Sequence, residues 1–395
     1  AVAISSNFDH SCVVLSDSKI KCWGDNILPV LGTEFEALQV PQNLPNLPND
    51  IVQVSSGSYH VCALGGNGTV YCWGAPSYGQ LGNGTYFQRG IPTPVTGIST
   101  AISIATGSQH SCALLADKTV RCWGLDSDGQ LGDGFNAQQN TPQTVPGLSD
   151  VKGIYAGGTK TCAILTDGSA KCWGNGALGS IGDGNTSNRN IPTAVVGVTD
   201  FKYISMGAGD TVCGQTNAGA AYCWGDNTYG QVGDGTTTHR SLPTAVTNVT
   251  GIKKITPGSW STCALLNDKT VKCWGLNSDG QLGNNSTTNS VTAVSVQNLL
   301  DAEDISVYGR HACVTTTADV TKCWGQNTYA QIGDGTATMR TTPVSLTLGD
   351  IAKLSLGQWH GCGLHTDKSV SCWASNYYNV VGAFETNVPW EVSGE

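Results

Sequence analysis

The stretch that decides the fold is IVQVSSGSYHVCALGGNGTVYCWG at residues 51–74, followed by GQLGNG at residues 79–84. Apolar and polar residues alternate at its start and again around its two cysteines, Cys62 and Cys72. Clusters of Gly and Asn separate these short runs. Such a pattern predicts short β-strands joined by tight turns, and we expect about four strands in this unit of about 50 residues.

The tripeptide Cys-Trp-Gly marks the same unit along the whole chain. An eighth copy, Cys372-Trp373-Ala374, differs only in its last residue. About four strands in a repeat of about 50 residues indicate a β-propeller, whereas a linear β-solenoid has shorter repeats without an internal hairpin. The sequence therefore predicts an all-β fold, a single closed propeller of about eight four-stranded blades that forms one domain over residues 1–395. The seven complete copies lie at residues 22–24, 72–74, 122–124, 172–174, 223–225, 273–275 and 323–325.

The composition excludes several classes of protein. Charged residues make up 12% of the 395 residues, about half of the usual ~25%. The net charge is -9 and no basic run occurs, which argues against a nucleic-acid partner. No apolar stretch reaches the ~18 residues of a membrane span. With 51 Gly and 11 Trp, the chain is also unlike a helical bundle or a disordered protein.

All 16 cysteines form pairs ten positions apart. If residues 66–68 form a three-residue turn, Gly65 faces Thr69 and Cys62 faces Cys72. Opposed residues have Cα atoms ~4.5–5.5 Å apart, within reach of a disulfide, so we predict one disulfide in each blade. Zinc is the alternative, although its neighbouring ligands are usually two to four residues apart. The pairs are Cys12 with Cys22, Cys62 with Cys72, Cys112 with Cys122, Cys162 with Cys172, Cys213 with Cys223, Cys263 with Cys273, Cys313 with Cys323, and Cys362 with Cys372.

This many disulfides would require an oxidising compartment, so we expect an extracellular protein, secreted or at the cell surface. The chain begins at Ala1 rather than Met, which we interpret as a mature form after signal-peptide removal. The exception is the cytosol of hyperthermophiles, where disulfides also persist. Sequons that allow glycosylation occur at Asn67, Asn83, Asn185, Asn248, Asn284 and Asn285.

The repeat resembles that of the regulator-of-chromosome-condensation family, over essentially the whole chain. The resemblance implies a β-propeller with four-stranded blades. It is carried in the third unit by Ile102, Ile104, Gly107, His110, Ser111, Ala113, Leu114, Asp117, Val120, Trp123, Gly124, Gly129, Gln130, Leu131, Gly132, Gly134, Pro142 and Val145.

Three features depart from the best-studied members of that family. Each unit adds a cysteine pair, as secreted bacterial versions of the repeat do, and there are eight units where well-known members have seven blades. The basic tail and β-wedge of the nuclear exchange factor are missing, as is the G-W-R-H-T motif of the plant ultraviolet-B photoreceptor. We therefore transfer the fold and none of these activities.

Three sets of polar residues recur in the repeat. Five histidines precede the first cysteine of their units by two positions, and we expect a hydrogen bond within the blade rather than a metal site, because Lys160 and Ser261 replace them elsewhere. Aspartates in G-D-G turns are interpreted as turn residues, with calcium as the alternative. Arginines three positions before a proline are expected to form a hydrogen bond between blades, to a carbonyl or to a turn aspartate. These sets are His10, His60, His110, His311 and His360; Asp133, Asp183, Asp234 and Asp334; and Arg89, Arg189, Arg240 and Arg340.

The first and last units break the symmetry with large apolar residues at positions that are polar elsewhere. We interpret them either as packing where the ring closes or as a contact surface for a partner. Two additional tryptophans, each three positions before a cysteine, could serve as binding anchors on one rim. The candidate interface comprises Leu28, Val30, Phe35, Tyr377, Tyr378, Phe384, Trp390, Trp260 and Trp359.

No catalytic motif stands out from the repeat, so we expect a protein that is not an enzyme and needs no cofactor or metal. The first hypothesis is an extracellular structural or adhesive protein, including a self-assembling cell-surface or fibre subunit. The second is a secreted protein-binding module or enzyme inhibitor that uses rim loops and aromatics, similar to the secreted propeller of this fold that blocks β-lactamases. The expected partners are a protein or a second copy, with a glycan also compatible.

Overall fold

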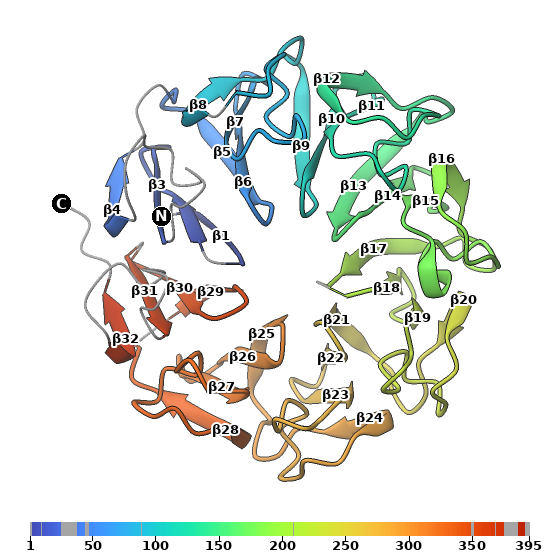
Figure 1. Ribbon diagram of the computed structural model, residues 1–395. Coiled ribbons are helices and arrows are strands. Elements are labelled where there is room, and N and C mark those ends of the chain that lie inside the picture. The colour runs from blue at the N-terminus through green and yellow to red at the C-terminus, as the bar shows by residue number, and fades with distance from the viewer. Residues whose placement is uncertain are drawn as a thin grey trace.

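The computed structural model describes residues 2–8, 10–24, 38–43, 47–87, 89–207, 209–348, 351–367, 369–374 and 386–391. These residues form eight four-stranded antiparallel sheets arranged as the blades of a closed ring (Figure 1). The predicted propeller with eight blades is therefore confirmed. The one helical element described is the short 3-10 helix η1 (Ala177–Gly179). Within the described ranges, no helix has the length and hydropathy needed to cross a membrane.

Each blade consists of four consecutive strands, ordered from the axis outwards. The inner strands are β1 (Ala3–Asn7), β5 (Ile51–Ser56), β9 (Ala101–Thr106), β13 (Val151–Gly157), β17 (Phe201–Met206), β21 (Ile252–Pro257), β25 (Ala302–Tyr308) and β29 (Ile351–Leu356). The second strands are β2 (His10–Val14), β6 (His60–Gly65), β10 (His110–Leu115), β14 (Lys160–Leu165), β18 (Thr211–Thr216), β22 (Ser261–Leu266), β26 (His311–Thr316) and β30 (Gly361–His365).

The third strands are β3 (Ile20–Gly24), β7 (Val70–Gly74), β11 (Val120–Gly124), β15 (Ala170–Gly174), β19 (Ala221–Gly225), β23 (Val271–Gly275), β27 (Thr321–Gly325) and β31 (Val370–Ala374). The outer strands are β4 (Leu38–Asn43), β8 (Arg89–Pro94), β12 (Gln139–Thr144), β16 (Arg189–Ala194), β20 (Arg240–Ala245), β24 (Ser290–Ser295), β28 (Arg340–Leu346) and β32 (Thr386–Glu391).

The hairpin between the second and third strands has the predicted register. In blade 2 the amide of Gly65 donates to the carbonyl of Thr69, and Gly68 adopts a positive φ of 83°. Counting outward along the two strands, Cys62 lies directly opposite Cys72.

All eight cysteine pairs are disulfides, which confirms the prediction. Their Cα atoms are 4.1–4.2 Å apart, slightly closer than the separation we expected. Each bond joins the second strand of a blade to its third strand. The bonds are Cys12 with Cys22, Cys62 with Cys72, Cys112 with Cys122, Cys162 with Cys172, Cys213 with Cys223, Cys263 with Cys273, Cys313 with Cys323, and Cys362 with Cys372.

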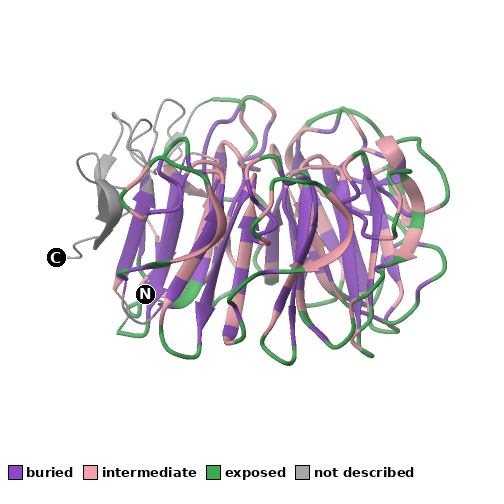
Figure 2. Cartoon of the chain, turned by 90° about the horizontal axis from the view of Figure 1, so that it is seen from below, coloured by how far each residue is buried: buried purple, intermediate pink, exposed green. Residues whose placement is uncertain are grey.

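The hydrophobic core lies between the blades rather than in one centre. The second and third strands are largely buried because each sheet packs against a neighbour on both faces (Figure 2). Trp123 of blade 3, for example, packs with Leu64, Val70 and Leu81 of blade 2. The same kind of cluster joins blade 8 to blade 1, where Trp23 packs with Leu364. The ring therefore closes by ordinary blade-to-blade packing, without exchanging a strand across the junction.

Indole N–H groups fasten neighbouring blades together. In the described part of the chain, six of the repeat tryptophans donate to a backbone carbonyl in the preceding blade, at the loop that joins its third and outer strands. This bond satisfies the polar atom of a side chain that is otherwise fully buried. The pairs are Trp123 with Gln80, Trp173 with Gln130, Trp224 with Ser180, Trp274 with Gln231, Trp324 with Gln281 and Trp373 with Gln331, at 2.8–3.0 Å.

Candidate functional site

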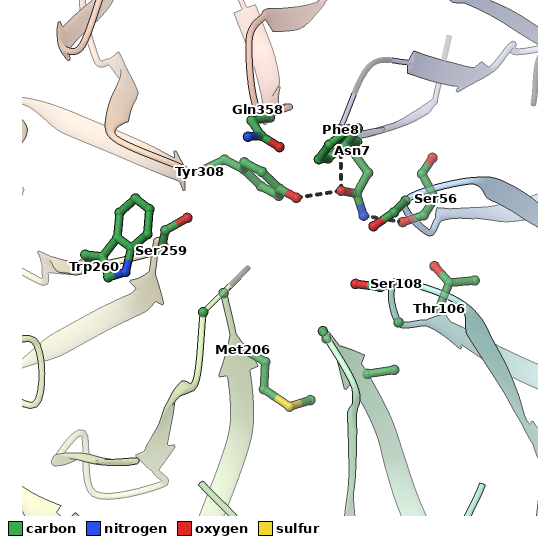
Figure 3. A pocket seen from close by; sticks show the side chains of 17 residues that line it. Asn7, Phe8, Ser56, Thr106, Ser108, Met206, Ser259, Trp260, Tyr308 and Gln358 are labelled. Atoms are coloured by element: carbon green, nitrogen blue, oxygen red, sulfur yellow. Dashed lines mark hydrogen bonds between the residues drawn. The ribbon is translucent and has the colours of Figure 1, made fainter. Parts of the chain in front are cut away.

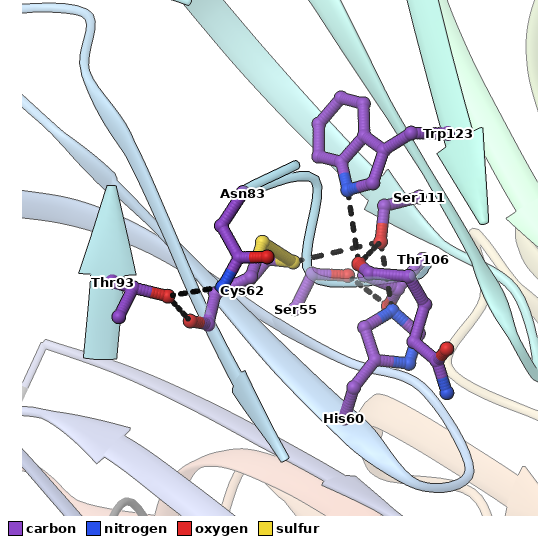
Figure 4. Close-up of a disulfide and its surroundings, with 10 residues drawn as sticks. Ser55, His60, Cys62, Asn83, Thr93, Thr106, Ser111 and Trp123 are labelled. Atoms are coloured by element: carbon purple, nitrogen blue, oxygen red, sulfur yellow. Dashed lines mark hydrogen bonds between the residues drawn. A yellow bond between two sulfur atoms is a disulfide. The ribbon is translucent and has the colours of Figure 1, made fainter. Parts of the chain in front are cut away.

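Three of the five repeat histidines bond to the next blade, so our prediction of a bond within the blade is wrong for them. The imidazole of His60 lies over Gly57, where a Cβ atom would come within 2.4 Å of the ring. The absent side chain leaves the ring pointing at the neighbouring sheet, where Nε2 reaches a hydroxyl group (Figure 4). The three pairs are His60 with Ser111 at 2.7 Å, His110 with Thr161 at 2.8 Å and His360 with Ser11 at 2.7 Å.

Burial keeps these imidazoles neutral. It lowers the pKa of His60 and His360 to about 3, and that of His10, His110 and His311 to about 4. Each ring lies between two blades, and no group of three or more His, Cys, Asp or Glu side chains in the described residues could hold a metal ion. The arrangement of these rings therefore serves the contact between blades.

Lys160 takes the histidine position in blade 4 and keeps the same role. Its side chain is only 1% exposed, and its Nζ lies 2.6 Å from Oδ1 of Asp210 in blade 5. A buried ammonium needs an opposite charge or hydrogen-bond acceptors to offset its desolvation. The substitution at Lys160 is thus matched by a carboxylate in the next blade.

Three of the repeat arginines pair with a turn aspartate, as one of our alternatives predicted, but the aspartate lies in the same blade rather than in a neighbouring one. Nε of Arg189 donates to Oδ2 of Asp183 over 2.7 Å, and Arg240 and Arg340 contact the turn aspartates of their own blades. The loop after the third strand folds back onto the start of the outer strand, so residues six apart meet. Burial would raise the pKa of Asp234, but hydrogen bonds from Thr236 and Arg240 outweigh it and lower that pKa. The side chain of Arg89 lies outside the described residues.

Asp126 occupies a position that is Asn in five other units, among them Asn227 of blade 5. There the amide of Asn227 donates to the backbone carbonyls of Thr236 and Thr238, and its Oδ1 accepts from a backbone amide. Asp126 keeps the accepting bond, from the amide of Leu131 over 2.9 Å. Its other oxygen is buried without a partner among the described residues. Burial, reinforced by nearby carboxylates, raises the pKa of Asp126 to about 7.

We therefore expect Asp126→Asn to stabilise the protein by about 1–2 kcal/mol at pH 8, because the new amide can donate where the carboxylate cannot. A carboxyl group whose pKa is raised in the folded state stabilises most at low pH, and this contribution is lost as the pH rises through 7. The gain should consequently shrink at pH 4. Guanidinium unfolding at both values tests this, with Asp128→Asn as the control that removes a neighbouring charge. Equal gains in stability at the two pH values would contradict a raised pKa for Asp126.

A cavity of about 430 Å³ opens on the propeller axis, where the inner strands turn back into the second strands (Figure 3). All eight blades contribute to it. Asn7 fixes part of its wall, since its side chain donates to the carbonyl of Ser56 over 2.9 Å and accepts from the hydroxyl of Tyr308 over 2.6 Å. The lining residues are Asn7, Phe8, Ser56, Ser58, Thr106, Gly107, Ser108, Ala156, Gly157, Gly158, Met206, Gly207, Gly209, Ser259, Trp260, Tyr308 and Gln358.

Two of the interface candidates lie at this end of the molecule. Trp260 lines the cavity, and the guanidinium of Arg310 sits over its ring at 4.6 Å from the centroid. Trp359 packs edge-on against Tyr329 of the preceding blade, with ring centroids 4.7 Å apart. The side chains of the other candidates, Leu28, Val30, Phe35, Tyr377, Tyr378, Phe384 and Trp390, lie outside the described residues.

Most of the cavity-lining residues were missed at the sequence level. Ser58, Ser108 and Gln358 are ordinary polar residues that stand directly after a repeat glycine, and no motif distinguishes them. A comparison of that position through the eight units would have found them, because the hairpins that carry it surround the axis in a closed ring.

Two sequence models of the Regulator of chromosome condensation (RCC1) repeat match the chain. The first matches residues 67–114, 119–164 and 218–265, and the second matches residues 1–27, 51–80, 101–130 and 252–281. Together they cover just over half of the sequence. The chain belongs to the RCC1-repeat family. A search of curated proteins finds no sequence that matches it.

Several solved structures share the fold of this RCC1-repeat protein. Human WBSCR16 superposes with a TM-score of 0.70 and 20% identity, covering 86% of this chain and 96% of that chain. Yeast RCC1 (Prp20), in a structure with Kap60, superposes with a TM-score of 0.66 and 18% identity, covering 89% of this chain and 91% of that chain. Prp20p from Saccharomyces cerevisiae, described with its binding to Gsp1p and histones, superposes with a TM-score of 0.65 and 18% identity. That match covers 84% of this chain and 87% of that chain. At these identities the likeness shows the fold alone.

Proposed function

We propose that this chain is a secreted, non-catalytic structural or adhesive protein. The observation that carries the proposal is the disulfide across the central hairpin of every blade, since such crosslinking is typical of proteins that must persist in an oxidising medium. Two groups that could perform chemistry lie instead in contacts between blades. His110 is buried and neutral, and Lys160 is paired with Asp210.

Exposed apolar side chains on the perimeter support self-association. We call Phe87, Phe135, Ile191 and Leu242 the perimeter stripe; they lie in outer strands or in the loops that lead to them, in blades 2 to 5. Phe87 is 77% exposed and Phe135 is 67% exposed. A Cβ atom on Gly134 would lie 3.9 Å from Cγ2 of Ile191, so the loop of blade 3 reaches the outer strand of blade 4. Exposed apolar side chains grouped on one part of a surface often mark a site of association between proteins.

The test is whether the purified protein assembles. Electron microscopy and size-exclusion chromatography of concentrated protein should show regular oligomers or fibres. Phe135→Ser combined with Ile191→Ser should shift the protein to monomers. Leu300→Ser is the matched control, because Leu300 is 77% exposed but lies in the connection between β24 and β25, beyond the opposite end of an outer strand. Monomers at all concentrations would count against the self-assembling role.

A second candidate function, a protein-binding module or enzyme inhibitor, is favoured by the aromatic rim. Arg310 is held over Trp260 by an ion pair with Asp279 over 3.0 Å, and Trp and Arg are the residues that most often dominate binding energy at protein interfaces. Affinity capture from the native extracellular medium should then recover one defined protein, and Trp260→Ala should abolish its capture. Recovery of no partner would weaken this candidate.

A further inference from the structure

The axial cavity is built for an uncharged ligand. None of its described lining residues is charged. Among the residues that the structure describes, two cations beside the cavity are already paired with carboxylates, Arg310 with Asp279 and Lys160 with Asp210. An ionic ligand would lose hydration there without gaining a counter-charge. The volume of about 430 Å³ lies within the range of about 300–1,000 Å³ that is usual for small-molecule sites.

Unused hydrogen-bonding groups converge on this cavity from four blades. Within the described part of the chain, the hydroxyls of Ser58, Ser108 and Ser259 and the side-chain amide of Gln358 have no hydrogen-bond partner in the protein. Hydroxyl and amide groups both donate and accept. A ligand that fits them must itself carry many groups that donate and accept, which is the property of a polyol.

Aromatic and hydroxyl-bearing side chains both line the cavity. Trp260 and Tyr308 lie on one side of the opening, while Thr106 and Ser108 lie on the other (Figure 3). The Trp260 ring is 37% exposed and is held in place by Arg310. An aromatic face beside hydrogen-bonding groups suits a pyranose, whose axial C–H groups form an apolar face and whose hydroxyls project from its edge.

We propose that the axial cavity binds a neutral saccharide. Trp260 stacks on the sugar ring, and Ser58, Ser108, Ser259 and Gln358 bond to its hydroxyls. The inference rests on the adhesive role proposed above and names the chemistry of its ligand.

The test is calorimetric titration of the full chain with cellohexaose, mannohexaose and chitohexaose, and with hexagalacturonate as the anionic comparator. At least one neutral hexamer should bind with a Kd in the micromolar to millimolar range, roughly that of a weak small-ligand site, and hexagalacturonate should bind at least about tenfold more weakly. Trp260→Ala should weaken binding about tenfold or more, and Ser108→Ala by about threefold to tenfold, in line with the loss of one stacking or hydrogen-bonding partner.

Two controls keep the outcome clear. Leu300→Ala removes an exposed apolar side chain from the connection between β24 and β25 and should leave the affinity unchanged. Trp260→Phe keeps an aromatic face and should retain most of the binding, which separates loss of stacking from loss of folding. Binding of no neutral hexamer, equal binding of hexagalacturonate, or an affinity insensitive to Trp260→Ala would overturn the inference, as would a protein loop occupying the cavity in a captured complex.

The same samples separate this inference from the proposed function. Assembly in the electron microscope without saccharide binding would refute the cavity assignment alone. Saccharide binding by a protein that remains monomeric would refute the self-assembling role and leave the cavity assignment standing.

Discussion

Dithiothreitol is expected to leave the native protein intact and to prevent its refolding once it has been unfolded. All 16 cysteines are at most 1% exposed, so a thiolate cannot reach the sulfur atoms while the blades are packed. In the chain-entropy model, each closed loop of about ten residues stabilises the fold by roughly 2–3 kcal/mol. Eight loops together give roughly 16–24 kcal/mol, which exceeds the roughly 5–15 kcal/mol net stability of a typical protein.

The measurement combines alkylation, mass spectrometry and circular dichroism. Native protein in reductant should take up no iodoacetamide, while protein reduced in guanidinium chloride should take up sixteen equivalents and remain unfolded after dilution. The single-blade variant Cys162→Ser with Cys172→Ser gives the scale, with an expected loss of about 2–3 kcal/mol. A fully reduced chain that regains the native spectrum would show that packing alone suffices.

Acid is expected to destabilise the protein steeply between pH 6.5 and pH 4. The five buried histidines have pKa values of about 3 or 4 in the folded state, below the ordinary value near 6.5. Groups with a depressed histidine pKa stay neutral in the fold but bind protons when the chain unfolds, so stability falls as the pH falls. At pH 5 each ring would remove about 2 kcal/mol, and the five together up to roughly 10 kcal/mol.

Guanidinium unfolding at pH 7 and pH 5 measures this loss. The double variant His60→Gln with His110→Gln should be less stable at pH 7, because it disturbs two contacts between blades, but should lose about 4 kcal/mol less on acidification. His239→Gln is the control, since that ring is partly exposed and lies outside the buried set. An unchanged dependence on pH in the double variant would show that these rings do not control the acid response.

The sequence predicts the features that are repeated in every unit and depend on residues close together in the chain, namely the hairpin register and the number of blades. The ten-residue spacing of Cys62 and Cys72 determines the hairpin register, because a three-residue turn with Gly68 in a left-handed conformation leaves only one pairing. The blade count follows from the number of units. Both results depend on residues that are close in the chain, where geometry allows few alternatives.

Contacts between units could not be predicted in the same way. The partner of His60 is Ser111, 51 positions away in the next blade, and the direction of that contact depends on how two sheets pack. Our prediction for the arginines also placed the partner in the wrong blade. The fold of the loop between Asp183 and Arg189 brings these two side chains together within one blade, and the spacing of the repeat does not reveal that fold. The cavity is lined by the inner hairpins of all eight blades and exists only once the ring is complete.

The ring closes between blade 8 and blade 1 with contacts of the same kind that join the interior blades, and every sheet is complete within its own repeat. Recombination that inserts or removes one whole unit would therefore leave no sheet short of a strand and no tryptophan or histidine position without a neighbour. Such an event would change the diameter of the ring and of its axial opening in a single evolutionary step. The number of repeats can thus evolve separately from the residues that line the axis.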